Sequence, residues 1–419
     1  MQKSFNVFYG WYVVAISALG LSTGIAPFLF ASLGLFMLPL HDEFGWNRAE
    51  ISAVIPVLIV SIMITQPFAG RLIDKIGARK ILIPSTIAFG LLIAAIPIFM
   101  SEIWHLAAIF FLIGTLGVAA NNLPYMRIVS NWFNKKRGLA IGASVSGIGL
   151  GYAYTPILVQ SIIDAQGWRA AYYVLSLLVL FITLPLITFF LKESPESMGM
   201  LADGEKISES NNKPQSKLGF SSSVIIRKKE FWILLGIFLL ISFNLHGLLP
   251  HLVPMLSDRG FDTSTAALVA SSLGITVFIS RILIGYLLDI FFAPYVAAFF
   301  FALSALGFAL FAFTTTPALM FLAAILAGLS LGAEMDILAY LIGKYFGLRS
   351  FGEVYGLLFV GIFIGSAFGP PAFGLWFENT GSYSGVLILA IAFNIATVLL
   401  TMKLSPYPGP NEFDETTTV

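Results

Sequence analysis

Residues 51–100 read ISAVIPVLIVSIMITQPFAG (51–70), RLIDKIGARK (71–80) and ILIPSTIAFGLLIAAIPIFM (81–100). The first and third parts are almost entirely apolar, whereas the short middle part holds five charged residues. A run of about 20 apolar residues is long enough for an α-helix to cross the hydrocarbon core of a bilayer. This stretch therefore predicts two transmembrane helices joined by a charged loop.

The same pattern runs through all 419 residues. Hydrophobic residues make up 58% of the chain and charged residues only 11%, with a mean hydropathy of +0.90. Soluble domains carry about 25% charged residues, so the composition excludes a soluble enzyme, a nucleic-acid-binding protein and a disordered scaffold. Backbone groups must be paired in hydrocarbon, and the runs are too long for barrel strands, so an all-α membrane protein is expected. The runs predict twelve transmembrane helices, near 11–31, 51–70, 81–100, 105–130, 139–163, 170–191, 231–255, 266–288, 294–314, 318–342, 354–377 and 383–403.

Lysine and arginine are unevenly divided between the two alternating sets of predicted loops. Eighteen of the 23 lie in the set that includes both termini, three lie in the other set, and two lie inside spans. Basic residues favour the cytoplasmic side, so both termini are expected in the cytoplasm. No removable signal peptide is expected, because no cleavage site separates Met1 from the first span.

The only long polar segment, 192–229, predicts a cytoplasmic linker between two halves. The expected domains are a six-helix bundle at 1–191, this linker, a second six-helix bundle at 230–403 and a cytoplasmic tail at 404–419. Seven positions recur between the halves at an offset of 214 or 215 residues, which indicates a duplicated, pseudo-symmetric six-helix unit. The pairs are Gly45/Gly260, Gly70/Gly285, Asp74/Asp289, Gly142/Gly356, Gly147/Gly361, Gly151/Gly365 and Pro156/Pro370.

Parallel six-helix repeats describe the major facilitator architecture, in which substrate binds near the midplane and the halves rock. The segment GRLIDKIGARK (70–80) resembles the signature loop that follows the second helix in this superfamily. The resemblance implies that Asp74 and Arg79 act in gating, by pairing with a neighbouring helix end and latching one conformation. The second-half copy from Gly285 to Asp289 keeps the glycine and the acid but lacks the basic residues.

Two further segments resemble the monocarboxylate transporters of that superfamily. WFNKKRGLAIGASVSG (132–147) is similar to their signature at the start of helix 5, and Tyr9-Gly10-Trp11 resembles their other signature without its acidic residue. Arg281 falls where this family places its substrate-carboxylate arginine, although Val277 replaces the Asp or Asn often found one turn earlier. Leu29, a further expected substrate-site position, stands where animal members have lysine. The resemblance implies a bacterial relative of monocarboxylate and oxalate/formate transporters in the cytoplasmic (inner) membrane.

Four charged residues lie inside predicted spans: Arg127, Arg281, Glu334 and Asp336. Such residues usually serve function, because insertion costs on the order of 2.5–3.5 kcal/mol each. Arg281 is expected to bind a substrate carboxylate through its planar fork. Glu334 or Asp336 is expected to carry a coupling proton, the alternative being a fixed salt bridge with Arg127 or Arg281. The two acids point about 200° apart on a helix, and Arg127 is expected to act in structure or gating.

Several polar residues in the spans are candidates to bind substrate. Asn121 and Tyr125 lie one turn apart on helix 4, Ser146 lies in the glycine row of helix 5, and His251 lies near the outer end of helix 7. Each has the alternative role of bonding one helix to another. His246 and His251 are poorly spaced for one metal and the chain has no cysteine, so no metal site and no cofactor are expected.

These features predict a secondary transporter that moves a small organic anion, a monocarboxylate such as lactate or pyruvate, in symport with a proton by alternating access. One alternative is anion exchange of the oxalate/formate type, and another is transport of a larger amphipathic compound such as a siderophore or drug. A membrane enzyme is disfavoured because no HExxH or GxxxxGK[ST] motif is present. The expected partners are the anion, the proton and the lipid bilayer, without nucleic acid or an obligatory protein partner.

Overall fold

A computed structural model describes residues 8–133, 135–204, 219–347 and 349–408. Over these residues the secondary structure is helical apart from one isolated β-bridge between Gly219 and Gly347. Ten helical segments in the described ranges are long and apolar enough to cross a membrane. The predicted all-α, multi-pass membrane fold is confirmed.

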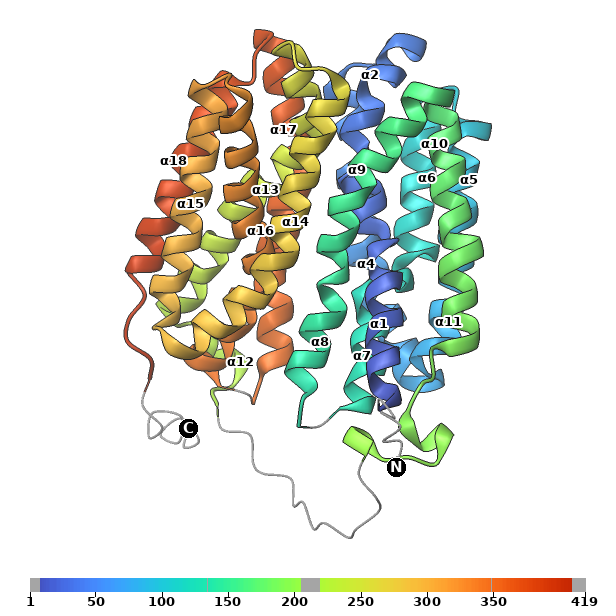
Figure 1. Cartoon of the computed structure of the whole chain (residues 1–419). Helices are drawn as coiled ribbons and strands as arrows, with labels where there is room; N and C mark the ends of the chain where they lie inside the picture. Colours follow the sequence, from blue (N-terminus) through green and yellow to red (C-terminus); the bar gives the residue numbers. More distant parts are fainter. Residues whose placement is uncertain (1–7, 134, 205–218, 348, 409–419) are drawn as a thin grey trace, which may run out of the picture. The chain divides into compact units, whose positions relative to one another are not determined.

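The chain divides into two compact units. Unit 1 comprises Met1–Ser210 together with Asp262–Gly274; the helices α1 to α11 run from blue to green in Figure 1, and the first part of α14 is yellow. Its elements are α1 (Tyr9–Ser22), the π-helix η1 (Ala26–Phe30), α2 (Leu33–Phe44), α3 (Arg48–Ser52), α4 (Val54–Ile76), α5 (Ala78–Phe99), α6 (Ile103–Leu116), η2 (Val118–Ala120), α7 (Asn122–Trp132), α8 (Arg137–Val145), α9 (Gly147–Gln166), α10 (Trp168–Leu177), the π-helix η3 (Leu178–Thr183), α11 (Leu184–Phe190), η4 (Pro195–Met198) and η5 (Ala202–Gly204).

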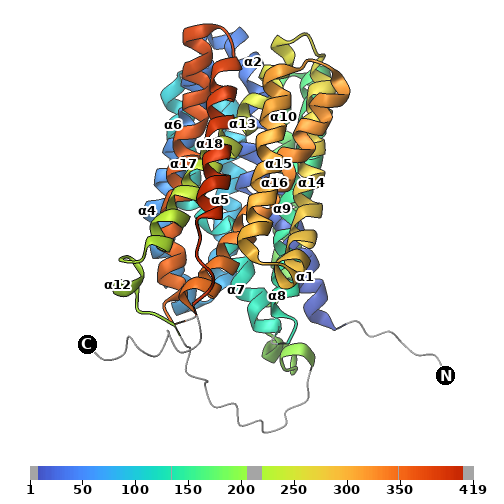
Figure 2. The same ribbon diagram turned by 90° about the vertical axis from the view of Figure 1, so that its left-hand side faces the viewer.

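Unit 2 comprises Asn211–Phe261 and Ile275–Val419. Its elements are α12 (Ser222–Ile225), α13 (Lys229–Asp258), α14 (Thr263–Ile290), α15 (Ala293–Phe313), α16 (Pro317–Phe346), α17 (Phe351–Thr380) and α18 (Ser384–Met402). Helices α15 and α16 run side by side in both views (Figures 1 and 2). The first part of α14 groups with unit 1, where Gly274 lies against the backbone of Tyr152 in α9.

Equivalent helices pair in the same way within each unit. Helix α1 packs on α8 and α9 in unit 1, and α13 packs on α17 in unit 2; α5 packs on α6 and α10, and α15 packs on α16 and α18. Two of the repeated glycine pairs, Gly147/Gly361 and Gly151/Gly365, lie at these crossings. A Cβ atom on Gly147 would collide with the carbonyl group of Ala18 in α1, and one on Gly365 would collide with the carbonyl oxygen of Leu239 in α13. This part of the sequence repeat therefore corresponds to helix crossings that recur in both units.

Several predicted spans are divided into shorter helical segments, and two of these, at 105–130 and 139–163, are also absent from the ten candidate spans. The span at 105–130 is divided into α6, η2 and α7. Asn121 takes an extended conformation there, and its Oδ1 accepts a hydrogen bond from the next backbone N–H at 2.9 Å. Asn121 thus caps a new helix, and Pro124 fits the first turn because it lacks an N–H that a helix start leaves unpaired. The span at 139–163 is divided at Ser146 into α8 and α9.

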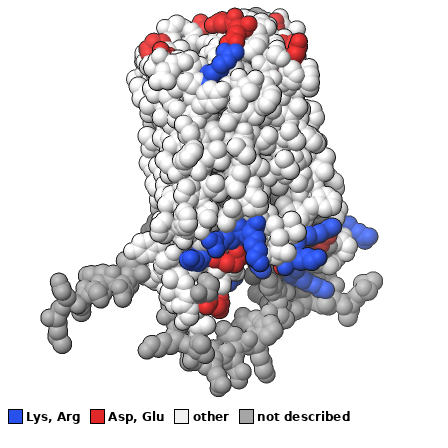
Figure 3. All heavy atoms as spheres, turned by 90° about the vertical axis from the view of Figure 1, so that its right-hand side faces the viewer, with Lys and Arg blue, Asp and Glu red and all other residues white. Residues whose placement is uncertain are grey.

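The surface matches a protein embedded in a bilayer. On the face drawn in Figure 3, charged side chains gather at the two ends and leave a wide uncharged band between them, with lysine and arginine concentrated at one end. Large apolar side chains point outward, among them Phe181 at 71% and Phe313 at 72% exposure. Lipid tails cover such side chains in a membrane, which explains why the charged fraction is so small.

Part of the predicted linker at 192–229 and most of the predicted tail lie outside the described residues, namely 205–218 and 409–419. The described parts of the linker hold the short helices η4, η5 and α12, of which η5 contacts α7 of unit 1 and α12 contacts α17 of unit 2. Trp132 at the end of α7 donates from Nε1 to the carbonyl oxygen of Lys192 at 3.0 Å. The start of the linker is therefore anchored to unit 1.

Candidate functional site

The intramembrane charges of unit 2 lie where α14 and α16 pack closely. Gly332 of α16 permits the approach, because a Cβ atom there would lie 2.6 Å from the carbonyl oxygen of Val277. Ser280 of α14 is buried and donates its hydroxyl hydrogen to the carbonyl oxygen of Leu329 at 2.6 Å. Arg281 follows Ser280 directly, so these contacts fix the backbone that carries its guanidinium.

Arg281 forms an ion pair with one of the two acids of α16. Its Nη1 lies 3.8 Å from Oδ2 of Asp336, and the two side chains are 9% and 39% exposed. This separation exceeds the roughly 2.7–2.9 Å of a charge-assisted hydrogen bond. Nε of Arg281 is buried and has no hydrogen-bond partner in the described part of the chain. The guanidinium therefore keeps donors for another acceptor.

Glu334 has different surroundings from Asp336. Its side chain is fully buried, and Ser242 of α13 donates its hydroxyl hydrogen to Oε1. The other carboxyl oxygen, Oε2, is buried and has no hydrogen-bond partner among the described residues. The two acids thus contact different helices, with α13 next to Glu334 and α14 next to Asp336.

Tyr355 of α17 also belongs to this group. It lies within electrostatic range of Arg281, Glu334 and Asp336, and the guanidinium is in turn within range of both acids. Four helices of unit 2 thus place one cation, two carboxyl groups, a serine and a tyrosine together. This group is called the charged cluster below.

His251 lies elsewhere in unit 2 and is bound by protein groups on both sides of its ring. Nε2 lies 2.8 Å from the carbonyl oxygen of Pro370, and Nδ1 lies 2.9 Å from the hydroxyl oxygen of Tyr383. A carbonyl oxygen only accepts, so Nε2 carries hydrogen and Nδ1 of the neutral ring accepts from Tyr383. The side chain is fully buried. This geometry favours the helix-packing alternative, while a contact with substrate stays a prediction.

The predicted substrate residues of unit 1 are held by their own unit. Tyr125 is 1% exposed, and its hydroxyl lies so close to Gly20 of α1 that a Cβ atom there would collide with it. Asn121 caps α7, and Ser146 donates its hydroxyl hydrogen to the carbonyl oxygen of Ala143 at 2.7 Å. Leu29 is 3% exposed within the π-helix η1. These contacts position helices, and a role in binding substrate stays a prediction.

The signature loop joins α4 to α5 and reaches neighbouring helices of unit 1. Oδ1 of Asp74 lies 3.9 Å from Nη2 of Arg127 in α7, and both side chains are more than half exposed. Arg127 therefore pairs with the signature loop and is 57% exposed, which favours a structural or gating role over a pair with Glu334 or Asp336. An exposed pair of this kind contributes about 0–1 kcal/mol, so it is weak enough to open and close.

Arg79 makes the second contact of the loop. Its Nη2 donates to the carbonyl oxygen of Thr188, while the backbone N–H groups of Ala78 and Arg79 donate to the two carboxylate oxygens of Glu193 at 2.8 and 2.7 Å. A carboxylate at a helix N-terminus satisfies unpaired N–H groups and interacts favourably with the helix dipole. Glu193 thus caps α5 from the beginning of the linker.

Removal of this cap should lower stability. We expect Glu193→Ala to reduce the free energy of unfolding by about 1 kcal/mol, as for loss of other N-terminal caps, and to lower the melting temperature in detergent. The exposed Glu196 on the same segment is the matched control, and Glu196→Ala should leave the melting temperature within error. Equal melting temperatures for both variants would mean that the cap contributes nothing.

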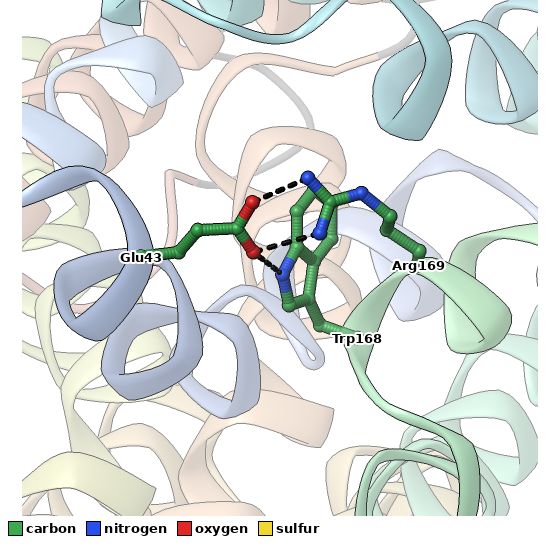
Figure 4. A network of polar contacts seen from close by, with 3 residues as sticks. All are labelled: Glu43, Trp168 and Arg169. Atoms are coloured by element: carbon green, nitrogen blue, oxygen red, sulfur yellow. Dashed lines mark hydrogen bonds and ion pairs between the residues drawn. The ribbon is translucent and has the colours of Figure 1, made fainter.

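A bidentate ion pair joins α2 to α10 at another place in unit 1 (Figure 4). Nη1 of Arg169 donates to Oε2 of Glu43 at 2.7 Å, Nη2 donates to Oε1, and Nε1 of Trp168 donates to Oε2 at 2.8 Å. Arg169 also lies over the Trp168 ring, 4.2 Å from its centroid. The hydrogen bonds from Arg169, and then from Trp168, hold the pKa of Glu43 below its ordinary value of 4.5.

A lowered folded-state pKa gives stability that is present above the unfolded value and lost as the pH falls through the folded value. We therefore expect the melting temperature to decrease below about pH 4.5, by a modest amount because the pair is partly exposed. Glu43→Gln should remove part of this acid-side decrease. Asp42→Asn, at the exposed neighbouring position, is the control. Identical pH profiles for wild type and Glu43→Gln would contradict the assignment.

The two segments that resemble monocarboxylate transporter signatures lie against each other in unit 1. The ring centroids of Tyr9 and Trp132 are 5.4 Å apart, and those of Trp11 and Phe133 are 5.0 Å apart. Gly10 lies between these aromatic residues, since a Cβ atom there would lie 2.9 Å from the Phe133 ring. The aromatic residues of the two motifs therefore pack against each other where α1 begins and α7 ends.

Within the described residues, no group of three or more His, Asp or Glu side chains is arranged to hold a metal ion. The pentapeptide from Gly328 to Gly332 has the Gly-x-Ser-x-Gly spacing of a hydrolase nucleophile. It lies in the middle of α16, whereas that motif works on a sharp strand-to-helix turn. It carries no catalytic arrangement here.

A family model described as Major Facilitator Superfamily matches residues 19–370 and, in a second match, 252–417. The chain belongs to the Major Facilitator Superfamily. It is thus a membrane transporter and not an enzyme. The superfamily resemblance given by the signature loop is confirmed.

Similar facilitators cover almost the whole chain. The uncharacterized MFS-type transporter YcxA of Bacillus subtilis is 24% identical over 417 residues, which are 97% of each chain. Monocarboxylate transporter 11 of Homo sapiens is 25% identical over 410 residues, 92% of this chain and 82% of its own. A crystal structure of a bacterial homolog to the human lysosomal transporter Spinster, inward-facing and unoccupied, shares the fold with a TM-score of 0.67 at 15% identity, over 96% of this chain and 95% of that one.

Sequence reasoning missed three side chains of this facilitator that the structure places at important contacts. Ser242 donates a hydrogen bond to Glu334, Tyr355 is a member of the charged cluster, and Glu193 caps α5. Glu193 follows directly after the last apolar run of the first half, which is a usable signal for a cap on a neighbouring helix. Ser242 and Tyr355 lie in apolar spans with many other hydroxyl-bearing residues, and nothing in their spacing distinguishes them.

Proposed function

We propose that this facilitator carries a small organic monocarboxylate, such as lactate or pyruvate, together with one proton by alternating access. The observation that supports this most directly is Arg281, a largely buried arginine on α14 whose Nε has no hydrogen-bond partner within the described ranges. A guanidinium binds a carboxylate through two parallel hydrogen bonds. One available cation suits a substrate with one carboxylate.

The names of some relatives support the same substrate class. Several proteins similar to this chain over most of its length are monocarboxylate transporters of mammals, at 21–25% identity. Proton coupling is supported by Glu334 and Asp336, since a buried carboxyl group near an arginine changes its proton affinity when an anion enters. In this proposal Asp74, Arg79 and Arg127 form the gate, and Tyr125, Asn121, Ser146, Leu29 and His251 shape the path or the bundles around it.

The proposed location is a bacterial inner membrane with both termini in the cytoplasm. It is supported by the position of eighteen of the 23 basic residues in one set of predicted loops and by the concentration of lysine and arginine at one end in Figure 3. The signature loop between α4 and α5 belongs to that set. The gate formed by Asp74 and Arg127 then faces the cytoplasm.

Uptake by purified protein in proteoliposomes tests this function. Radiolabelled lactate or pyruvate should accumulate when the outside is more acidic than the lumen, without any trapped anion. Accumulation that needs trapped oxalate, formate or another counter-anion, and ignores the pH difference, would identify an exchanger instead. Transport of a siderophore or drug in the absence of monocarboxylate uptake would point to a larger amphipathic substrate.

A further inference from the structure

The two carboxyl groups of α16 are only two residues apart but are bound in opposite ways. Asp336 is partly exposed and pairs with Arg281 at 3.8 Å. Glu334 is fully buried, receives a hydrogen bond from Ser242 at Oε1, and has no hydrogen-bond partner at Oε2 among the described residues. The sequence left open which acid carries the coupling proton, and this difference in surroundings separates the two roles.

The carboxylate of Asp336 pairs with Arg281 as the carboxylate of a bound substrate would. The Asp336 carboxylate neutralises the guanidinium, but at a distance too long for the two short parallel hydrogen bonds of a fork. A substrate carboxylate that formed both bonds would be held more tightly than Asp336 is. The partial exposure of Asp336 gives its carboxylate a place to hydrate once it is displaced.

Glu334 has the surroundings of a group that gains and loses a proton. Burial penalises an unpaired charge far more than a neutral acid, and the closest group bonded to Glu334 is a neutral hydroxyl. A serine hydroxyl can donate to a carboxylate and, after rotation, accept from a carboxylic acid. Ser242 therefore stays a partner of Glu334 in both protonation states.

We propose that Glu334 binds the coupling proton and that Asp336 occupies Arg281 until the substrate carboxylate displaces it; this assignment rests on the proposed function. The proton adds to the Glu334 carboxylate and forms a neutral acid. The substrate anion adds to Arg281 and frees Asp336. One positive and one negative charge enter together, so the loaded cluster has the same net charge as the empty one.

Other titratable groups near Glu334 define the rival assignments. His246 lies one turn from Ser242 on α13, with its Nδ1 3.2 Å from the Ser242 carbonyl oxygen. Tyr355 faces the cluster from α17, Arg281 from α14, and Asp336 lies on α16 itself. Of these, Asp336 and His246 are the groups that could bind the proton in place of Glu334.

Proteoliposomes with wild type, Glu334→Gln and Asp336→Asn test the assignment with radiolabelled lactate. A pH difference of one unit drives electroneutral 1:1 symport to about tenfold accumulation. Glu334→Gln should lower this ratio to about one and flatten the pH profile of uptake, with slower but detectable exchange. Asp336→Asn should keep accumulation and lower the half-saturation concentration severalfold, because a competing anion is removed. The reverse pattern would overturn the proposal.

Infrared difference spectra of purified protein test the proton site without any transport. A pH titration of wild type should show, beside the carbonyl bands of the exposed carboxyl groups, one further band of a protonated carboxylic acid that is absent in Glu334→Gln and remains in Asp336→Asn and His246→Gln. If lactate is not transported but this band behaves as expected, the substrate is wrong and the proton site stands. A band that persists in Glu334→Gln, or a pH profile flattened by His246→Gln alone, would overturn the assignment.

Discussion

Arg281→Ala should lower uptake of radiolabelled lactate in proteoliposomes by at least about 30-fold. Loss of one member of a buried, hydrogen-bonded charge pair costs about 2–5 kcal/mol, which corresponds to roughly 30-fold to several thousand-fold in affinity. Arg281→Lys should also abolish measurable uptake, because an ammonium group is a point charge and lacks the planar fork. Arg227→Ala, at an exposed position outside the candidate spans, is the matched control and should transport normally.

A structural role for Arg281 predicts a different result. If the arginine only neutralises Asp336, Arg281→Gln combined with Asp336→Asn should restore both stability and transport. If it binds substrate, the double variant should recover its melting temperature and remain inactive. Full transport by Arg281→Ala, or by the double variant, would contradict the assignment of the substrate site.

Gly365→Val should prevent α17 from packing on α13. A Cβ atom on Gly365 would lie 2.7 Å from the backbone nitrogen of Phe243 and would collide with the carbonyl oxygen of Leu239. Overpacking typically costs about 1–3 kcal/mol, and more where only backbone can move. Since folded proteins are stable by about 5–15 kcal/mol, we expect a sharply lower melting temperature or recovery of mostly aggregated protein in detergent.

The same helix offers a matched control for this prediction. Nothing lies within 4 Å of a Cβ atom on Gly356, so Gly356→Val should fold and melt like wild type. Because Ser242 also lies next to Gly365, any folded Gly365→Val protein should lose the hydrogen bond to Glu334 and with it proton-driven accumulation. Equal melting temperatures for the two valine variants would contradict the close crossing of α13 and α17.

The sequence was sufficient for the membrane fold because the bilayer reduces folding to a few rules. Long apolar runs must become helices. The repeated pair Gly151/Gly365 lies at two close crossings, because a Cβ atom on Gly151 of α9 would collide with the carbonyl oxygen of Ser22 in α1 and one on Gly365 of α17 with that of Leu239 in α13. Gly45 and Gly260, a further repeated pair, both take left-handed φ angles of +73° and +85°. At these positions only glycine permits the left-handed φ angle or the close backbone contact, so the spacing of the glycines could predict them.

The site was less predictable because it depends on which helix faces which. The charges of Arg281, Glu334 and Asp336 are conspicuous in apolar spans. Only the packing of α13, α14 and α16 decides that Glu334 bonds Ser242 and that Asp336 pairs with Arg281. The side-chain oxygens of Asn121 and Ser146, two predicted substrate residues, bond the backbone at helix interruptions, and their role in binding substrate stays a prediction. Local capping competes with ligand binding for the same polar atoms, and sequence spacing does not distinguish the two.

We propose that a monocarboxylate on Arg281 and a proton cross the membrane together. It is tested most directly by a pH recording of lightly buffered proteoliposomes after addition of unlabelled lactate, with lactate entry measured in parallel. The expected result is alkalinisation of the medium by one proton for each lactate taken up, absent in Arg281→Ala. Lactate entry without any change of external pH, dependent on an anion trapped in the lumen, would contradict the claim.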